Sequence, residues 1–95
     1  MCREYNGWTN YETWNVKLWF DNDVGTYDTV RDIVRDSRSE YEAGKNLREF
    51  VEEMNPLSSE ASMFSDMLGA AISSVNWQEI ASSYLEEIKE EETEE

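Results

Sequence analysis

The chain has no histidine and a single cysteine, Cys2. Without histidine, neither a Ser-His pair nor a Cys-His pair can be assembled, so these forms of nucleophilic catalysis are excluded. One cysteine can form neither an internal disulfide nor a zinc cage, which favours a reducing compartment. The four glycines are scattered and make no phosphate-binding loop. The sequence therefore predicts a protein that is not an enzyme and that holds no cofactor and no metal.

Long apolar runs are also missing. No stretch approaches the ~20 apolar residues that cross a bilayer, and the first residues lack the apolar core of a secretion signal. We therefore expect a cytoplasmic protein that does not contact membranes. Ninety-five residues leave room for only one hydrophobic core.

The apolar residues that are present recur at spacings of three and four along nearly the whole chain, which is the pattern of helices. This pattern predicts an all-α fold, a small single-domain bundle of about five helices with an acidic C-terminal end. We expect residues 1–88 to form the helical globular domain and residues 89–95 an acidic tail. The expected boundary signals are a Thr9/Glu12 capping box, a Thr26 cap, a break at Ala43-Gly44, a stop at Asn55-Pro56, a start at Ser58 or Ser59, and an Asn76/Glu79 capping box.

The first expected helix, about residues 10–22, is rich in aromatic residues. Its apolar positions occupy more than one stripe, so we expect it to be the central helix of the bundle. The same rings could form a stacking platform for bases, but single-strand binders add a basic groove, and only Arg3 and Lys17 lie nearby. Core packing is therefore the favoured interpretation of these rings, and also of the methionine pair one turn apart in the fourth helix. The residues are Trp8, Tyr11, Trp14, Trp19 and Phe20, with Met63 and Met67.

Negative charge dominates the composition. Twenty-two acids and eight bases give a net charge of −14, which disfavours direct binding of nucleic acid and calls for a basic partner. Residues 57–95 carry ten acids and one base, whereas residues 1–56 carry twelve acids and seven bases. In the last helix the acids recur every four residues, so they advance by ~6 Å each along the axis. Such rows resemble a sparse ladder of phosphates.

This ladder favours one function, that of an acidic DNA mimic that occupies the basic groove of a DNA-binding host protein. Three alternatives stay open. The tail can be merely solubilising; the chain can be an interaction module that binds a non-DNA site as an adaptor, antitoxin or assembly factor; or Glu49, Glu52 and Glu53 can hold Mg²⁺ in a small hydrolase. A homodimer is opposed by the charge unless its interface is strongly apolar. The expected phosphate-mimicking residues are Glu60, Asp66, Glu79, Glu86, Glu87, Glu90 and Glu91.

Two segments carry a resemblance to a known family. Residues 6–23 contain Thr13-Trp14-Asn15-Val16-Lys17-Leu18-Trp19 followed by Asn22-Asp23, and residues 75–81 read Val-Asn-Trp-Gln-Glu-Ile-Ala. They resemble the opening and closing motifs of an uncharacterised family of small acidic proteins from phages and mobile elements. In composition the chain also resembles phage anti-restriction proteins that mimic DNA. These resemblances imply an inhibitor of a host defence enzyme, either a restriction enzyme or a CRISPR effector, and they imply no catalytic residues.

Overall fold

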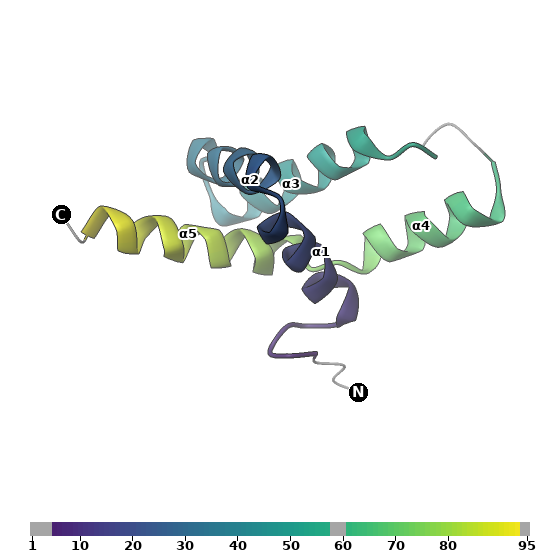
Figure 1. Cartoon of the computed structure of the whole chain (residues 1–95), viewed down its shortest axis with the longest axis horizontal. Helices are drawn as coiled ribbons and strands as arrows, with labels where there is room; N and C mark the ends of the chain where they lie inside the picture. Colours follow the sequence, from purple (N-terminus) through teal and green to yellow (C-terminus); the bar gives the residue numbers. More distant parts are fainter. Residues whose placement is uncertain (1–4, 58–60, 94–95) are drawn as a thin grey trace.

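Five helices make up the part of the chain that the computed structural model describes, residues 5–57 and 61–93 (Figure 1). They confirm the expected all-α bundle, and within these residues the only β contact is an isolated bridge between Tyr5 and Trp8. The molecule measures 50 × 31 × 24 Å, so it is elongated. The helices are α1 (Tyr11–Asn22), α2 (Val24–Asp36), α3 (Glu40–Met54), α4 (Met63–Ser74) and α5 (Trp77–Thr93).

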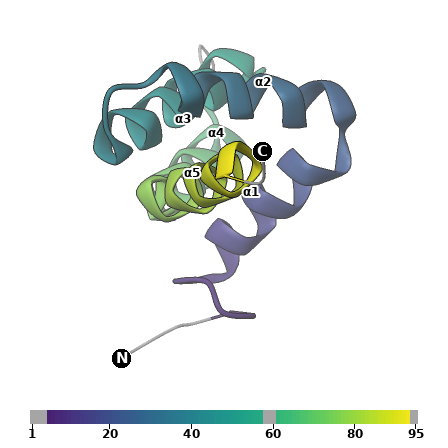
Figure 2. The ribbon, with the colours of Figure 1, turned by 90° about the vertical axis from the view of Figure 1, so that its left-hand side faces the viewer.

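The last helix, α5, occupies the centre of the bundle. Seen nearly end-on, it has α2 and α3 on one side and α1 on another (Figure 2). It buries more core side chains than any other helix: Trp77, Ile80, Ala81, Tyr84 and Ile88. The expectation that the first helix is central was therefore wrong. Only Thr13 and Phe20 of α1 are buried, since one side of this helix faces solvent.

Gly44 lies inside α3 and does not break a helix. Its Cα faces the backbone of α5, and a Cβ at this position would lie 2.9 Å from Gln78 N and 3.0 Å from the Trp77 carbonyl carbon. The absence of a side chain thus lets α3 and α5 approach closely. The break predicted at Ala43-Gly44 occurs instead at residues 37–39, where Ser37 is extended and the Ser39 side chain caps α3 by accepting from Glu42 N–H.

Several helix starts differ from the expected ones by a few residues. Asn10, not Thr9, caps α1, because its Oδ1 accepts a hydrogen bond from Thr13 N–H at 2.9 Å. The N-cap residue of α2 is Asp23 and not the expected Thr26, and Ser62 caps α4. The starts expected at Ser58 or Ser59 lie outside the described residues. The Asn76 cap is confirmed: its Oδ1 accepts from Glu79 N–H at 3.1 Å. The stop at Asn55-Pro56 is confirmed too, since α3 ends at Met54.

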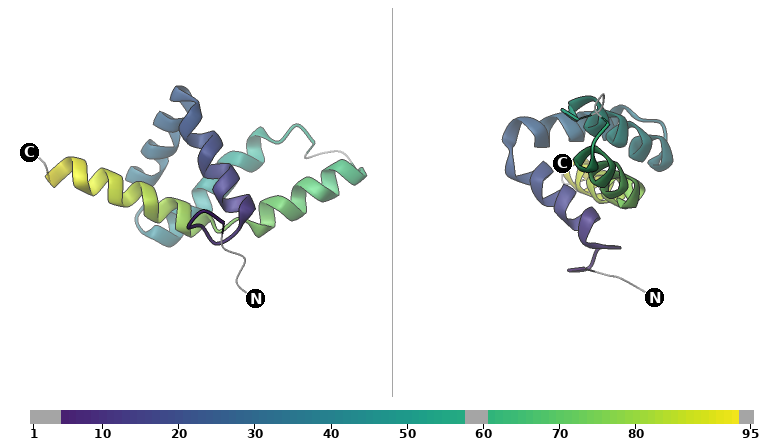
Figure 3. Two further views of the ribbon diagram at one scale, coloured as in Figure 1. Left: turned by 60° about the horizontal axis from the view of Figure 1, so that its bottom comes forward. Right: turned by 90° about the vertical axis from the view of Figure 1, so that its right-hand side faces the viewer.

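The helix α4 projects from the bundle as an arm. From the short turn between them, α4 and α5 extend in opposite directions (Figure 3). Leu68, Ile72 and Val75 pack toward the core, whereas Met63 is 65% exposed and Met67 62% exposed. Core packing of the two methionines was therefore a wrong prediction, because no described element covers the outer side of α4.

The aromatic residues of the N-terminal segment are only partly buried. Tyr5, Tyr11 and Trp14 contact one another with ring centroids 4.9–5.6 Å apart, and Tyr5 and Tyr11 are exposed. Trp19 is 66% exposed. Of the five rings assigned to the core, only Phe20 is fully enclosed, since the other side of α1 has no neighbour among the described helices.

Candidate partner-binding surface

The acids of α5 divide between two sides of the helix. Glu87 and Glu91 face α2, where they meet a cation. Glu86 and Glu90 are exposed, and together with the half-buried Glu79 they lie on the side turned away from the core. The residues that were expected to act as one set of phosphate mimics therefore have two different roles.

On the α2 side, Arg31 is the centre of an ionic cluster. Its Nη2 donates to Glu91 Oε1, and its Nε lies 4.0 Å from Glu87 Oε1. Nε is buried and has no hydrogen-bond partner among the described residues, so its contact with Glu87 is purely ionic. The hydrogen bond to Glu91 raises the pKa of Arg31. Tyr27 donates its phenol proton to Glu87, which raises the pKa of Tyr27. These contacts fix α2 against α5.

A second ionic cluster joins α1 to α5. Tyr84 is fully buried and donates its hydroxyl proton to Asp21 Oδ1 at 2.6 Å. Burial, and then this hydrogen bond, raise the pKa of Tyr84 well above its usual value. Lys17 Nζ lies 2.6 Å from Asp21 Oδ2 and 4.6 Å from the centre of the Tyr84 ring. The Asp21 charge is thus balanced inside the protein.

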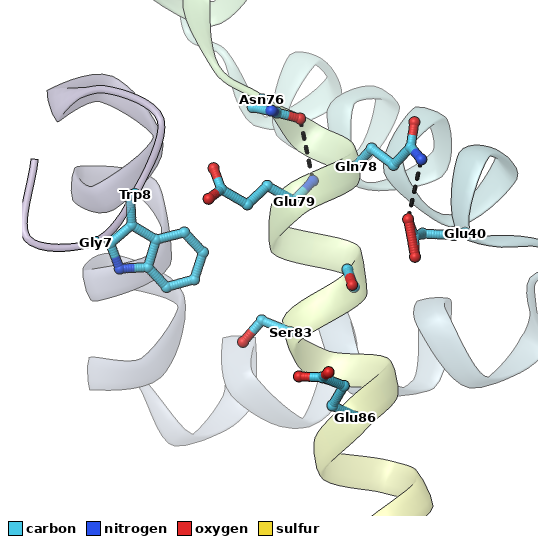
Figure 4. Close-up of a pocket in the computed structure, with 9 residues that line it drawn as sticks. Gly7, Trp8, Glu40, Asn76, Gln78, Glu79, Ser83 and Glu86 are labelled. Atoms are coloured by element: carbon cyan, nitrogen blue, oxygen red, sulfur yellow. Dashed lines mark hydrogen bonds between the residues drawn. The ribbon is translucent and has the colours of Figure 1, made fainter. Parts of the chain in front are cut away.

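Two of the outward acids, Glu79 and Glu86, line an open groove of about 590 Å³. Glu79 and Glu86 of α5 border it, with Glu40 of α3 on one flank and Trp8 on the other (Figure 4). One oxygen of Glu40 accepts from Gln78 Nε2 at 2.9 Å. No basic side chain among the described residues lines the groove, so its carboxylates keep unused acceptor positions. An indole beside carboxylates suits a guanidinium or ammonium group, because the ring face attracts cations.

The position of Trp8 in this groove is fixed by hydrogen bonds between the two ends of the chain. Thr9 N–H donates to Glu79 Oε1 at 3.1 Å, and Asn10 Nδ2 donates to the Ser74 carbonyl at 2.7 Å. Asn76 N–H donates to Thr13 Oγ1 at 2.9 Å. Apart from Ser74, these residues belong to the two segments, 6–23 and 75–81, whose motifs stand out in the sequence. The motifs therefore bind each other, and Glu79 holds the N-terminal segment with one oxygen.

The two remaining predicted residues do not join the α5 surface. Asp66 is exposed on α4 and lines a different groove, between α3 and α4, together with Arg48 and Glu52. Glu60 lies outside the described residues. Of the three acids considered for Mg²⁺, Glu52 pairs with Arg48 at 3.2 Å. No group of three acidic or cysteine side chains in the described ranges has the geometry of a metal site.

Sequence reasoning missed two residues of the groove, Trp8 and Glu40. Trp8 was assigned to the core together with the other rings, after a base-stacking platform was considered, and Glu40 lay in a segment expected to be the end of the second helix. A signal for Trp8 was present in Asn6-Gly7, because a turn there reverses the chain. Asn6 and Gly7 both have positive φ, 51° and 88°. Nothing in the sequence indicated Glu40, because its place depends on how α3 lies along α5.

The whole chain, residues 1–95, matches the family described as "Family of unknown function (DUF7249)", and the chain belongs to that family. No curated protein and no solved structure matches it. Within residues 5–57 and 61–93, none of the helices has both the length and the apolar character needed to cross a membrane.

Proposed function

We propose that this member of a family of unknown function is a non-catalytic binding protein that enters the basic nucleic-acid groove of another protein as an acidic mimic of DNA. The partner proposed is a phage-defence enzyme in the host cytoplasm, either a restriction enzyme or a CRISPR effector. The proposed origin is a phage or mobile element, which the two sequence motifs imply. The observation that carries the proposal is the outward row of Glu79, Glu86 and Glu90 on the central helix.

The row suits this task because its helix is held in place and the carboxylates of Glu86 and Glu90 are exposed to a partner. Glu86 and Glu90 stand one turn apart, ~6 Å along the helix axis, and neither forms an ion pair with another described residue. The Arg31 cluster and the Tyr84 cluster hold α5 against α2 and α1. A charge array that is already ordered loses little entropy on binding, and negative potential speeds its capture by a basic groove.

The test begins with affinity capture of the partner from the host, followed by displacement of a labelled DNA duplex from the captured protein. Glu86→Lys with Glu90→Lys is expected to abolish displacement. Glu49→Lys with Glu53→Lys is the matched control, since it changes the net charge equally on exposed positions of α3. Raising NaCl should weaken the complex steeply. A partner that holds DNA and this chain at once would contradict the proposal.

The alternative, an adaptor, antitoxin or assembly factor that binds a non-DNA site, is favoured by one observation, the exposure of Met63 and Met67. Methionine side chains adapt to varied apolar surfaces. This function predicts that removal of residues 89–95 leaves partner binding intact and that the complex tolerates salt. The DNA mimic predicts a weaker complex in both conditions, so the two measurements separate the functions.

A further inference from the structure

The outer side of α4 carries an apolar strip that no described element covers. Met63, Met67, Ala70 and Ser74 form it at spacings of four, three and four, which places them along one side of the helix. All four are exposed, and Phe64 beside them is 65% exposed. We refer to Met63, Met67, Ala70 and Ser74 as the α4 strip. Its inner counterpart, Leu68 and Ile72, already packs on the core.

The α4 strip lies in the least charged part of the chain. Residues 61–78 contain one charged residue, Asp66, whereas the whole chain has a net charge of −14. A basic partner of the kind proposed above finds no row of acids here. The α4 strip is complementary to another neutral, apolar surface. The same strip on a second copy of this chain is such a surface.

The order of side-chain sizes along the strip favours a second copy over an unrelated surface. The two large residues, Met63 and Met67, stand in the N-terminal half of α4, and the two small ones, Ala70 and Ser74, in the C-terminal half. When two strips pair antiparallel about a two-fold axis, the methionines of each copy lie over the small residues of the other.

The shape of the molecule lets two copies meet despite their charge. The chain is 50 Å long, and α4 and the C-terminal end of α5 extend in opposite directions (Figures 1 and 3). Contact through α4 keeps the two acidic ends further apart than the ~8–10 Å over which salt screens charge. Met63, Phe64 and Met67 together expose on the order of 400 Å² per copy, so a dimer reaches the ~1,000 Å² of a specific interface once the small residues contribute.

From these observations we infer that the chain forms an antiparallel homodimer through the α4 strip. The inference is independent of the DNA-mimic proposal, because the strip shares no residue with the outward acids of α5. The two also differ in their response to salt. Added NaCl screens the repulsion between two acidic copies and strengthens the dimer, whereas it weakens a complex with a basic groove.

The test is sedimentation equilibrium of the full chain up to about 500 µM, a range that detects a dimer with modest buried area. The average mass should rise from 11.2 kDa toward twice that value, and the fraction of dimer should be larger at high salt. Met67→Glu, which brings two carboxylates together near the two-fold axis, should weaken the dimer at least about 100-fold. The variant should stay folded in circular dichroism, because Met67 is 62% exposed and is not part of the core.

Trp19→Glu is the matched control, since Trp19 of α1 is as exposed as the methionines and lies outside the strip. It should leave the dimer unchanged. Met63→Glu is a second variant of the strip and should weaken the dimer as Met67→Glu does. A wild-type chain that stays monomeric at the highest concentration overturns the inference. So does a dimer that persists in both strip variants, or one that added salt dissociates.

Discussion

Thr13 and Asn76 join the two ends of the chain: the backbone N–H of Asn76 donates to Thr13 Oγ1 at 2.9 Å across 63 positions of sequence. The Thr13 side chain is fully buried, and its hydroxyl donates to Asn10 Oδ1 at 2.6 Å. One hydroxyl thus serves both the cap of α1 and the start of α5. Because this buried hydroxyl forms both hydrogen bonds, removing one oxygen atom should lower the stability of the fold.

Replacing Thr13 with valine is expected to lower the free energy of unfolding by about 1–3 kcal/mol, because the Asn76 N–H loses its acceptor and the part-buried hydrogen bond between the two segments is lost. Urea denaturation followed by tryptophan fluorescence measures the change. Thr13→Ser keeps the hydroxyl, so it should lower the free energy of unfolding by less than Thr13→Val does. If Thr13→Val were no more destabilising than Thr13→Ser, the hydroxyl and its hydrogen bonds would contribute no more to stability than the methyl group that serine lacks.

Gly44→Ala is expected to destabilise the protein by about 1–3 kcal/mol, because the added Cβ would lie 2.9 Å from the Gln78 backbone nitrogen and would push α3 away from α5. The control is Gly69→Ala, also inside a helix, where a Cβ meets nothing within 4 Å. That variant should gain up to about 1 kcal/mol from helix propensity. Thermal melts of the two variants should therefore shift in opposite directions, and shifts of the same sign would contradict the packing role of Gly44.

The two sides of α5 should respond oppositely to the loss of charge. Glu87→Gln with Glu91→Gln removes the partners of the largely buried Arg31, and we expect a loss of up to about 1 kcal/mol. Glu86→Gln with Glu90→Gln changes the net charge by the same amount but removes only repulsion, so stability should hold or rise. Chemical denaturation of both double variants tests this difference. Equal losses would show that the Arg31 cluster does not anchor α2.

Stability should fall as the pH rises above about 10, the usual tyrosine pKa. Tyr84 and Tyr27 have raised pKa values in the folded chain, through burial and a hydrogen bond to Glu87 respectively. The folded state therefore keeps these protons while the unfolded state loses them, and alkaline pH favours unfolding. Tyr84→Phe should flatten the decline in unfolding free energy between pH 9 and 11, a range chosen around that value. Tyr41→Phe, at a phenol that is 72% exposed, is the control and should leave the decline unchanged.

The sequence predicted the helices well because periodicity and capping are local. Asn76 caps α5 as expected, but the carboxylate of Glu79 bonds to Thr9, a contact that no local pattern encodes. Gly44 was misread as a break, since a glycine that ends a helix and one that admits a neighbouring helix look the same in sequence. The Met67 error has a different cause. An apolar residue at helical spacing marks a side of the helix, but it does not say whether the same chain covers that side.

The same limit applies to the acidic residues. The spacing of Glu86, Glu87, Glu90 and Glu91 placed all four on one helix, and this was sufficient to propose a charged surface. It could not show that Arg31, about sixty positions earlier, pairs with two of them. Which glutamates face outward is decided by the packing of α2 on α5.

The central place of α5 bears on how the protein is made. Ribosomes deliver this helix after the other four, at ~5–20 residues per second, and it supplies the side chains around which α2 and α3 close. Until Ile88 has left the exit tunnel, Val30, Val34 and Leu47 have no complete core to enter. The first four helices therefore cannot complete their core before α5 has been made, and a chain interrupted before Trp77 exposes apolar helix faces to chaperones and proteases.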